Sequence, residues 1–570
     1  MTAVLGINCV YHESAAALVV DGDLVAACEE ERFSRVKHGK NAEVHNASDL
    51  PLLAVGECLA MAGIEPNDLD WVALSFSPEL RRDRFALDEL SHPGDWGSED
   101  GERTFRHQLQ AIPDKVRAFL GGGFAGGVAT MSHHLAHAAS AFYPSGFDRA
   151  AVLVVDGIAE SDTTAMFEAE GREIRPLGAV DYPHSIGFVW EKLSAYLGFS
   201  PYDASKTMGL AAYGDPERYG EPFARLMAVN AQGYRVDPDV ARFRLADFGS
   251  LERLFGPRRL PDDAFEQRHY DLAAALQQAT INALSGLVQR LASTSDAQHL
   301  CLAGGVALNC VANAALNRLD HFDALYVPPA PHDAGTAIGA ALHHWHSENG
   351  SARHRPVASP YLGPAYGDEM IRDALSSAGL TSTHFQDHND LACHTAEHLI
   401  AGNIVAWFQG RMEFGPRALG NRSLLADPRD PGMRAIMNRR VKHREDFRPF
   451  APSVLAEDAE DWFDIGRTNT SHGYMLFTVP ARPERASQIP AVLHHDGSAR
   501  VQLVDRQLNP RFHDLIRTFA ARTGVPMLLN TSFNDSEPIV CTPQDAIATF
   551  LKTEIDVLVL GNYLVTRPVR

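Results

Sequence analysis

The first thirty residues form short apolar runs that are separated by turn residues. Residues 4–10 (VLGINCV) and 15–20 (AAALVV) each predict a buried strand. The Asp-Gly pair at 21–22 predicts a tight hairpin into a third strand at 24–30 (LVAACEE). The chain therefore opens with three consecutive strands.

The same pattern recurs at 151–174 (AVLVVDGIAESDTTAMFEAEGREI). An offset of 148 places Val4 on Val152 and Asn8 on Asp156, and a second turn, Glu-Gly-Arg, follows one residue late. We interpret this as an internal duplication of a strand-turn-strand unit. Two such units that aim loops at a central cleft are typical of the α/β superfold of actin, hsp70 and sugar kinases.

A third element of that superfold would be a Gly-rich turn between a strand and a helix. Residues 299–318 contain an apolar strand, then Gly304 and Gly305, then an Ala-rich helix that includes Asn309. The N-terminus of such a helix can bind phosphate, although a turn of this kind can equally serve packing alone. Residues 270–293 carry apolar side chains at a helical period and predict a long helix.

Small, polar and proline residues interrupt this pattern at 349–366. We place a domain boundary there, because linkers have this composition. The prediction is an N-terminal domain at 1–355 and a second α/β domain at 356–570.

Composition changes this picture little. The chain is 45% hydrophobic and 22% charged, as ordinary globular proteins are. It shows neither a basic leader nor the roughly 18–20 apolar residues that a membrane helix needs, so we expect a cytoplasmic protein without a membrane partner. Seven scattered cysteines include no CxxC pair, and the net charge of −21 argues against a nucleic-acid partner.

The segment MSHHLAHAASAF is the strongest chemical signal in the first domain. His133 and His137 are four residues apart, so on a helix they share one face. Alone, such a pair is often structural. Asp156 at a strand end and Asp333 before a helix would complete a site for iron, manganese or zinc, although each could also be a turn or capping residue. Ser140 is a further candidate for contacting phosphate.

The second domain concentrates basic residues on turns that are rich in glycine or asparagine. Arginine donates two parallel hydrogen bonds to phosphate, lysine supplies a point charge, and serine and asparagine add neutral hydrogen bonds. Any one of these residues could instead be a surface ion-pair partner. Together they predict an anion pocket formed by Arg417, Lys442, Arg448, Arg500, Asn530 and Ser532.

Several segments occur here in the order in which the O-carbamoyltransferases of the NodU, CmcH and TobZ type carry them. The chain resembles that family over essentially its whole length. The matching segments are HESAAALVVDG, EEERFSRVKHG, HHLAHAASAF, MGLAAYG, AGGVALN, FGPRALGNRS, RPFAPS and LNTSFND.

The resemblance implies a TsaD-like first domain and a YrdC-like second domain. In the second, carbamoyl phosphate and ATP would give carbamoyl-adenylate, with Mg²⁺ accompanying ATP. In the first, the carbamoyl group would pass to the hydroxyl of a small-molecule acceptor. The resemblance implies iron(II) as the metal, with the ligands His133, His137, Asp156 and Asp333. It implies that the adenylate or nucleotide contacts Lys37, Ser140, Gly304, Gly305 and Asn309. It implies that carbamoyl phosphate or ATP contacts Arg417, Lys442, Arg448, Arg500, Asn530 and Ser532.

His12 follows the first strand, where the resemblance places the acceptor. We expect it to act as a general base, because an imidazole can take a hydroxyl proton near neutral pH, although a structural role in the turn is also open. Lys442 and Arg500 are the catalytic candidates of the second domain. The loop after Asp156 reads DGIAE where the family often has DGxGE, so Ala159 would be strained if that position needs positive φ.

Two alternatives to carbamoylation of a secondary metabolite, such as an antibiotic, remain open here. One is modification of tRNA by threonylcarbamoylation, against which the acidic charge argues. The other is a nucleotide-gated binding protein of the hsp70 type, which leaves the histidines and the basic second domain unexplained. The sequence does not identify the acceptor, and it is compatible with a homo-oligomer.

Overall fold

The computed structural model describes residues 1–84, 91–230, 233–349, 356–357, 359–467 and 470–567. The chain divides into two compact units. Unit 1 comprises 1–31 and 38–357, and unit 2 comprises 32–37 and 358–570. Residues 350–355, where the sequence analysis ends the first domain, lie outside the described residues.

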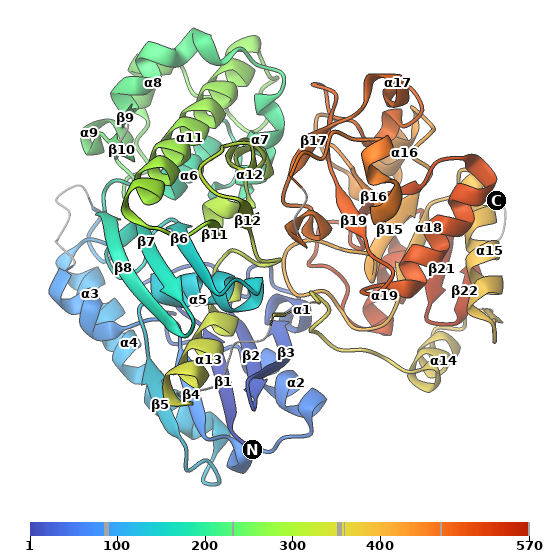
Figure 1. The fold of residues 1–570 in the computed structure, drawn as a ribbon, viewed down its shortest axis with the longest axis horizontal. Helices are drawn as coiled ribbons and strands as arrows, with labels where there is room; N and C mark the ends of the chain where they lie inside the picture. Colours follow the sequence, from blue (N-terminus) through green and yellow to red (C-terminus); the bar gives the residue numbers. More distant parts are fainter. Residues whose placement is uncertain (85–90, 231–232, 350–355, 358, 468–469, 568–570) are drawn as a thin grey trace. The chain divides into compact units, whose positions relative to one another are not determined.

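Unit 1 is built on two five-stranded sheets of the same topology (Figure 1). In each sheet three strands form an antiparallel meander, and two more continue parallel to the first of the three. This repeat confirms the predicted duplication and the α/β superfold of actin, hsp70 and sugar kinases. The first sheet has the order β3-β2-β1-β4-β5 and the second β8-β7-β6-β11-β12, with β1 Ala3–Asn8, β2 Ala15–Val20, β3 Asp23–Glu29, β4 Trp71–Leu74, β5 Gly127–Thr130, β6 Arg149–Val155, β7 Asp162–Glu170, β8 Glu173–Asp181, β11 His299–Ala303 and β12 Ala324–Tyr326.

The predicted hairpin between β2 and β3 turns at Asp21 and Gly22. Both residues have positive φ, 49° and 88°, as a two-residue turn that matches the strand twist requires. Gly171, with φ 60°, occupies the corresponding turn between β7 and β8. Local turn chemistry thus sets the register of both meanders.

Helices α5 (His133–Ser145) and α13 (Ala334–Glu348) pack against each other beside the first sheet. The contact is backbone to backbone. A Cβ on Gly339 of α13 would lie 1.8 Å from the Ala136 carbonyl oxygen, and one on Gly6 of β1 would lie 1.9 Å from that of Ala337. Glycine is therefore required at both positions, and it allows α13 to pack closely against β1 and α5.

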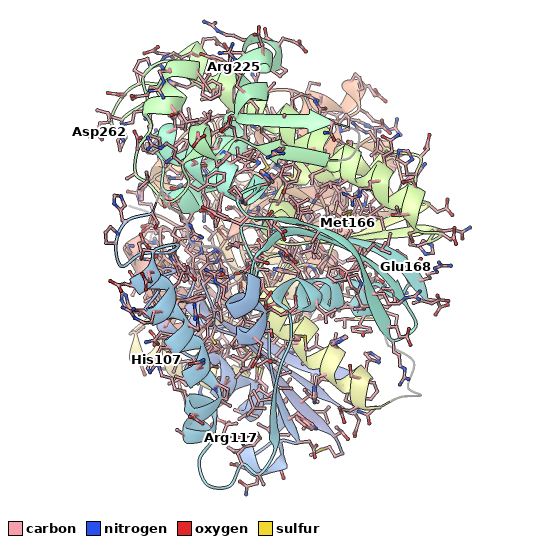
Figure 2. All side chains as sticks on the ribbon, turned by 90° about the vertical axis from the view of Figure 1, so that its left-hand side faces the viewer. His107, Arg117, Met166, Glu168, Arg225 and Asp262 are labelled. Carbon is pink, nitrogen blue, oxygen red and sulfur yellow. The ribbon has the colours of Figure 1, made fainter. Side chains whose placement is uncertain are left out.

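Longer helices cover the outside of unit 1. The predicted helix at 270–293 is present as α11 (Gln267–Thr294). Helix α4 (Glu99–Leu120) buries Leu109 and Val116, whereas His107 and Arg117 lie exposed on its outer face (Figure 2). The apolar stripe of α4 therefore faces the core, as its sequence period requires.

Unit 2 is a mixed eight-stranded sheet whose large apolar core includes Trp407 and Phe519. Helices α15 (His388–Ile400) and α18 (Pro510–Thr523) pack together, as do α14 (Asp368–Ser377) and α19 (Pro543–Lys552). The strand order is β13-β22-β21-β14-β15-β20-β16-β19, with β13 Thr383–His384, β22 Tyr563–Thr566, β21 Val557–Leu560, β14 Val405–Phe408, β15 Arg422–Ala426, β20 Met527–Ser532, β16 Ala451–Leu455 and β19 Gln502–Val504.

The short stretch 32–37 belongs to unit 2 although it lies near the start of the chain. Arg32 donates to the carbonyl of Gly415 at 2.8 Å. Arg35 donates to the carbonyls of Ile539 and Pro538 at 2.8 and 2.6 Å. Within the described residues, no helix of either unit has the length and apolarity needed to cross a membrane.

The close packing of α13 predicts a large effect of Gly339→Ala. The new methyl group would meet the backbone of α5, and overpacking of this kind destabilises a protein by about 1–3 kcal/mol. Gly56→Ala is the matched control, because Gly56 is an exposed position of helix α2 (Leu52–Ala62) with no atom near its Cβ. We expect thermal unfolding by circular dichroism to show a lower Tm for Gly339→Ala and an unchanged or higher Tm for Gly56→Ala. Equal Tm values would contradict the packing argument.

Candidate functional site

Four buried side chains converge between the two sheets of unit 1. His133 and His137 extend from the first turns of α5, Asp156 follows β6, and Asp333 precedes α13. The Nε2 atom of His133 lies 3.5 Å from Asp156 Oδ2 and 3.4 Å from Asp333 Oδ1. The Nε2 atom of His137 lies 3.4 Å from each of the same two oxygens.

These distances fit a shared metal ion better than hydrogen bonds. The Nε2 atoms of His133 and His137 are buried and have no hydrogen-bond partner among the described residues. Donors placed about 2.1 Å from an ion, at the corners of a tetrahedron, are about 3.4 Å apart. Two imidazoles with two carboxylates suit iron, manganese or zinc, so the residues present fit a divalent metal.

The electrostatics of the four residues agree with this arrangement. Burial alone would lower the pKa of His133, but the carboxylates of Asp333 and Asp156 raise it well above its usual value. Burial alone would raise the pKa of Asp156, but the imidazoles of His133 and His137 hold it well below its usual value. Both aspartates are therefore ionised at neutral pH, and the pocket attracts a cation.

Neighbouring groups orient two of these ligand candidates. His133 donates from Nδ1 to the Ser75 carbonyl at 3.0 Å, which turns Nε2 toward the aspartates. The backbone N–H of Gly305 donates to Asp156 Oδ1 at 3.0 Å. Gly304 has φ 91°, and a Cβ there would lie 2.2 Å from the Val155 carbonyl oxygen. The glycine pair thus positions Asp156.

Glu160 caps the helix that carries the two histidines. Its Oε1 atom accepts from the backbone N–H groups of His133 and Ser77, at 2.9 and 2.8 Å. The buried guanidinium of Arg81 donates to the Glu160 carbonyl at 2.9 Å and forms an ion pair with Glu102. Ala159, on the same loop, does not have positive φ, so the departure from DGxGE introduces no strain there.

His134 lies on the same helix but does not join the four-residue group. It is buried, and neither ring nitrogen has a hydrogen-bond partner. Burial lowers the pKa of His134 to about 3, so the ring is neutral at physiological pH. His134 therefore packs in the protein interior as an uncharged ring.

Two candidates for contacting nucleotide use their polar groups within the protein. The Ser140 hydroxyl donates to the His137 carbonyl at 2.8 Å. The Asn309 side chain accepts from the Ala312 N–H at 3.0 Å and donates to Gln277 at 3.0 Å. The predicted helix does not follow Gly305 directly. A short 3-10 helix (Gly305–Leu308) comes first, and α12 (Cys310–Asn317) then begins after Asn309, which caps it.

His12 and Lys37 lie in different units. His12 is half-buried on the loop after β1, with its ring 5.6 Å from that of Tyr202 and 6.2 Å from that of His38. Lys37 is exposed and belongs to the 32–37 segment of unit 2. The structure therefore places His12 within unit 1 and Lys37 outside it.

Lys442 is a buried cation of unit 2. Its ammonium group donates to the carbonyl of Ser532 at 2.6 Å and to the carbonyl and side-chain oxygens of Asn534 at 2.8 and 2.6 Å. The Ser532 hydroxyl lies 3.2 Å away. Burial, followed by the charges of Arg444 and Arg448, lowers the pKa of Lys442 well below its usual value.

Arg444 and Arg448 lie close to Lys442. Burial lowers the pKa of Arg444 to about 9, with further contributions from the charges of Arg448 and Arg500. Burial and nearby positive charge both lower an arginine pKa, because both disfavour the charged form. Of the predicted residues, Arg448 lies near Lys442, and Arg500 lies near Arg444, a cation that the sequence analysis did not single out.

The remaining basic motif, FGPRALGNRS, forms a loop around internal charges. Glu413 is buried and accepts from the N–H groups of Leu419, Asn421 and Arg422 at 2.7, 2.7 and 3.1 Å. Arg422 is fully buried and donates to carbonyl groups of the surrounding loop. Arg417 is half-buried in this loop.

Asn530 lies buried beneath the same loop. Its amide donates to the Ala418 carbonyl at 3.2 Å and to Ser453 at 2.9 Å. The structure therefore uses Asn530 to support the loop, whereas Ser532, two residues later, faces Lys442.

The comparisons with known proteins cover both units. The carbamoyltransferase N-terminus family matches residues 3–342, and the carbamoyltransferase C-terminus family matches residues 396–567. An uncharacterized protein of Synechocystis is 38% identical, covering 100% of this chain and 97% of its own length. Nodulation protein NolNO of Sinorhizobium fredii is 37% identical over 98% of this chain and 80% of its length.

Nodulation protein NolO of Bradyrhizobium diazoefficiens is 40% identical over 77% of this chain and 79% of its length. Among solved structures, component A of Acidaminococcus fermentans (R)-2-hydroxyglutaryl-CoA dehydratase aligns with 61% of this chain and 100% of its own at 16% identity, with a TM-score of 0.34. The two family matches together span most of the described residues. The chain therefore belongs to the carbamoyltransferase family and is an enzyme that transfers carbamoyl groups.

Proposed function

We propose that this carbamoyltransferase is ATP-dependent. Region 356–570 would form carbamoyl-adenylate from carbamoyl phosphate and Mg²⁺-ATP, and region 1–355 would transfer the carbamoyl group to a hydroxyl. The observation that carries the proposal is the cluster of mutually repelling cations around Lys442. Such a cluster favours binding of a polyphosphate or a phosphorylated substrate, because a bound anion relieves the repulsion.

The activation step needs dense positive charge, since both substrates are anions. Arg444, Arg448 and Arg500 would hold phosphate groups, and Lys442 would neutralise charge on the group being transferred. The overall reaction of this step converts carbamoyl phosphate, ATP and water to carbamoyl-adenylate, pyrophosphate and inorganic phosphate. The carbamoyl group then resides in a mixed anhydride with the α-phosphate of AMP.

The transfer step would use the buried group of unit 1. The acceptor oxygen bonds to the carbamoyl carbon, AMP leaves with the electrons of the broken C–O bond, and His12 takes the hydroxyl proton. A divalent ion held by the two histidines and two aspartates, Fe²⁺ by family resemblance with Mn²⁺ or Zn²⁺ as alternatives, would supply Lewis-acid polarisation. Glu160 and Ser75 would keep the His133 ring in place.

The acceptor we propose is a hydroxylated small molecule, a natural product of the antibiotic type. The net charge of −21 disfavours tRNA as the acceptor, because phosphate contacts dominate affinity for nucleic acids. The relatives named as nodulation proteins match both units of the chain, which supports one shared reaction on different acceptors.

The first prediction of the proposed function concerns the activation step. Purified protein incubated with ATP and carbamoyl phosphate should release pyrophosphate and form carbamoyl-adenylate without any acceptor, measured by coupled pyrophosphate assay and mass spectrometry. Omission of carbamoyl phosphate is the control. Absence of both products from folded protein supplied with Fe²⁺ and Mg²⁺ would reject the proposed chemistry.

A second prediction separates the two reactions. Lys442→Ala should abolish carbamoyl-adenylate formation, because it removes the buried charge beside Ser532. His133→Ala should preserve adenylate formation but block transfer to a panel of hydroxylated metabolites, followed as mass gain of one carbamoyl group. Equal loss of the first step in both variants would show that the reactions are assigned to the wrong regions.

A third prediction tests the cation cluster by binding. Arg444→Ala should weaken the affinity for carbamoyl phosphate about 10- to 100-fold, since a hydrogen bond to a charged group contributes about 1.5–3 kcal/mol. Arg522→Ala is the matched control, because Arg522 is a partly exposed residue that pairs with Glu397 on the surface of α18. Isothermal titration calorimetry that gives the same affinity for both variants would contradict the anion site.

A fourth prediction concerns Glu160 as a positioning residue. Glu160→Ala removes the acceptor for two backbone N–H groups, including that of His133. Loss of such supporting contacts typically weakens metal affinity about 10- to 100-fold. Glu160→Gln keeps the oxygen acceptor and should bind metal almost as tightly as the wild type. Competition with a chelating dye measures the affinities, and wild-type affinity in Glu160→Ala would refute this role.

A further inference from the structure

A second group of metal-binding side chains lies beside the first. Glu13 is on the loop between β1 and β2, Glu29 ends β3, and His332 directly precedes Asp333. Glu29 is 3% exposed and His332 is 5% exposed, so the group is nearly as deeply buried as the four-residue centre. One ligand atom from each of the three residues lies within 4.8 Å of the other two.

The distances in this group resemble those around a shared ion. The Nε2 atom of His332 lies 3.7 Å from Glu13 Oε2 and 3.7 Å from Glu29 Oε1. These separations exceed the usual hydrogen-bond range of about 2.7–3.2 Å. Donors that each lie about 2.1–2.2 Å from one ion, at angles a little wider than tetrahedral, are separated by about this much.

The His332 ring has an unpartnered nitrogen on its other side. Nδ1 is buried and accepts or donates no hydrogen bond among the described residues. The two carboxylates face the other ring nitrogen, Nε2. A buried imidazole in that position is well placed to donate a lone pair to a cation.

Charge also calls for a cation at this position. Two carboxylates brought together in a buried site are unfavourable unless positive charge accompanies them. His38 Nδ1 contacts Oε1 of Glu13 at 2.5 Å, which leaves Oε2 directed at His332.

A rigid scaffold holds the two groups. The Asn8 amide donates to the carbonyls of His12 and Glu13 at 3.1 and 3.0 Å, and thereby fixes the loop in which Glu13 has φ 53°. The side-chain oxygen Oδ1 of Asn8 accepts from the hydroxyl of Ser75 at 3.1 Å, and the Ser75 backbone carbonyl in turn orients His133. Ligands for both groups are therefore preorganised by one hydrogen-bond network.

We propose that Glu13, Glu29 and His332 bind a second divalent cation. Two carboxylate oxygens with one imidazole suit a hard ion such as Mn²⁺, whereas the first centre has two imidazoles. His332 and Asp333 are consecutive, so one backbone turn contributes a ligand to each centre. Two neighbouring divalent ions can share the charge of a phosphate and polarise an attacking oxygen.

The test counts Mn²⁺ ions on metal-free full-length protein. Electron paramagnetic resonance of free Mn²⁺ during titration should give two bound ions per chain for the wild type. Glu29→Gln, which keeps the shape and removes the charge, should bind one ion, and Glu29→Gln combined with His137→Ala should bind none. Glu43→Gln, at an exposed loop position, is the matched control and should still bind two.

Glu13→Gln provides a second single variant on a different element, and it should also bind one ion. Circular dichroism verifies that each variant is folded. A wild-type stoichiometry of one would overturn the proposal. Two ions bound to folded Glu29→Gln and Glu13→Gln would overturn it as well. Because the readout is a count of ions, its outcome is independent of whether the carbamoyl-transfer chemistry is correct.

Discussion

The backbone contact of α13 with β1 and α5 is the constraint on which the centre of unit 1 depends. At Gly6 and Gly339 two main chains approach so closely that no side chain fits between them. This contact holds α13 against β1 and α5, and Asp333, directly before α13, lies opposite the two histidines of α5. The four ligand candidates, drawn from three distant parts of the chain, thereby come together at one place.

Much of unit 1 was predictable because its signals are local. Alternating apolar runs, the Asp-Gly turn and the repeat at an offset of 148 predicted both meanders, and the four-residue spacing put His133 and His137 on one helical face. The Ser75 carbonyl and the Glu160 cap could not be predicted, since a backbone oxygen or a remote carboxylate acquires its role only through tertiary packing. The same reason explains why Ser140 and Asn309, polar in sequence, are used as internal hydrogen-bonding groups.

Unit 2 shows a different limit. The basic segments predicted dense positive charge, yet the sequence does not distinguish a cation that faces a pocket from one that supports a loop. Arg422 is fully buried beneath backbone carbonyls, whereas Arg444 keeps a strongly perturbed pKa among other cations. That difference depends on which neighbours compensate the charge. Arg422 lies within the matching segment FGPRALGNRS, whereas Arg444 lies outside the matching segments, so motif matching alone could not identify the arginine that lies among other cations.

The membership of residues 32–37 in unit 2 has a consequence for synthesis on the ribosome. Arg35 is made 504 residues before its partner Ile539. At about 5–20 residues per second, this segment waits about 25–100 s for that partner to be translated. The hydrogen bonds from Arg35 to Pro538 and Ile539 therefore form only late in synthesis. Unit 2 is complete only when residues near the end of the chain join a segment that was made at its start.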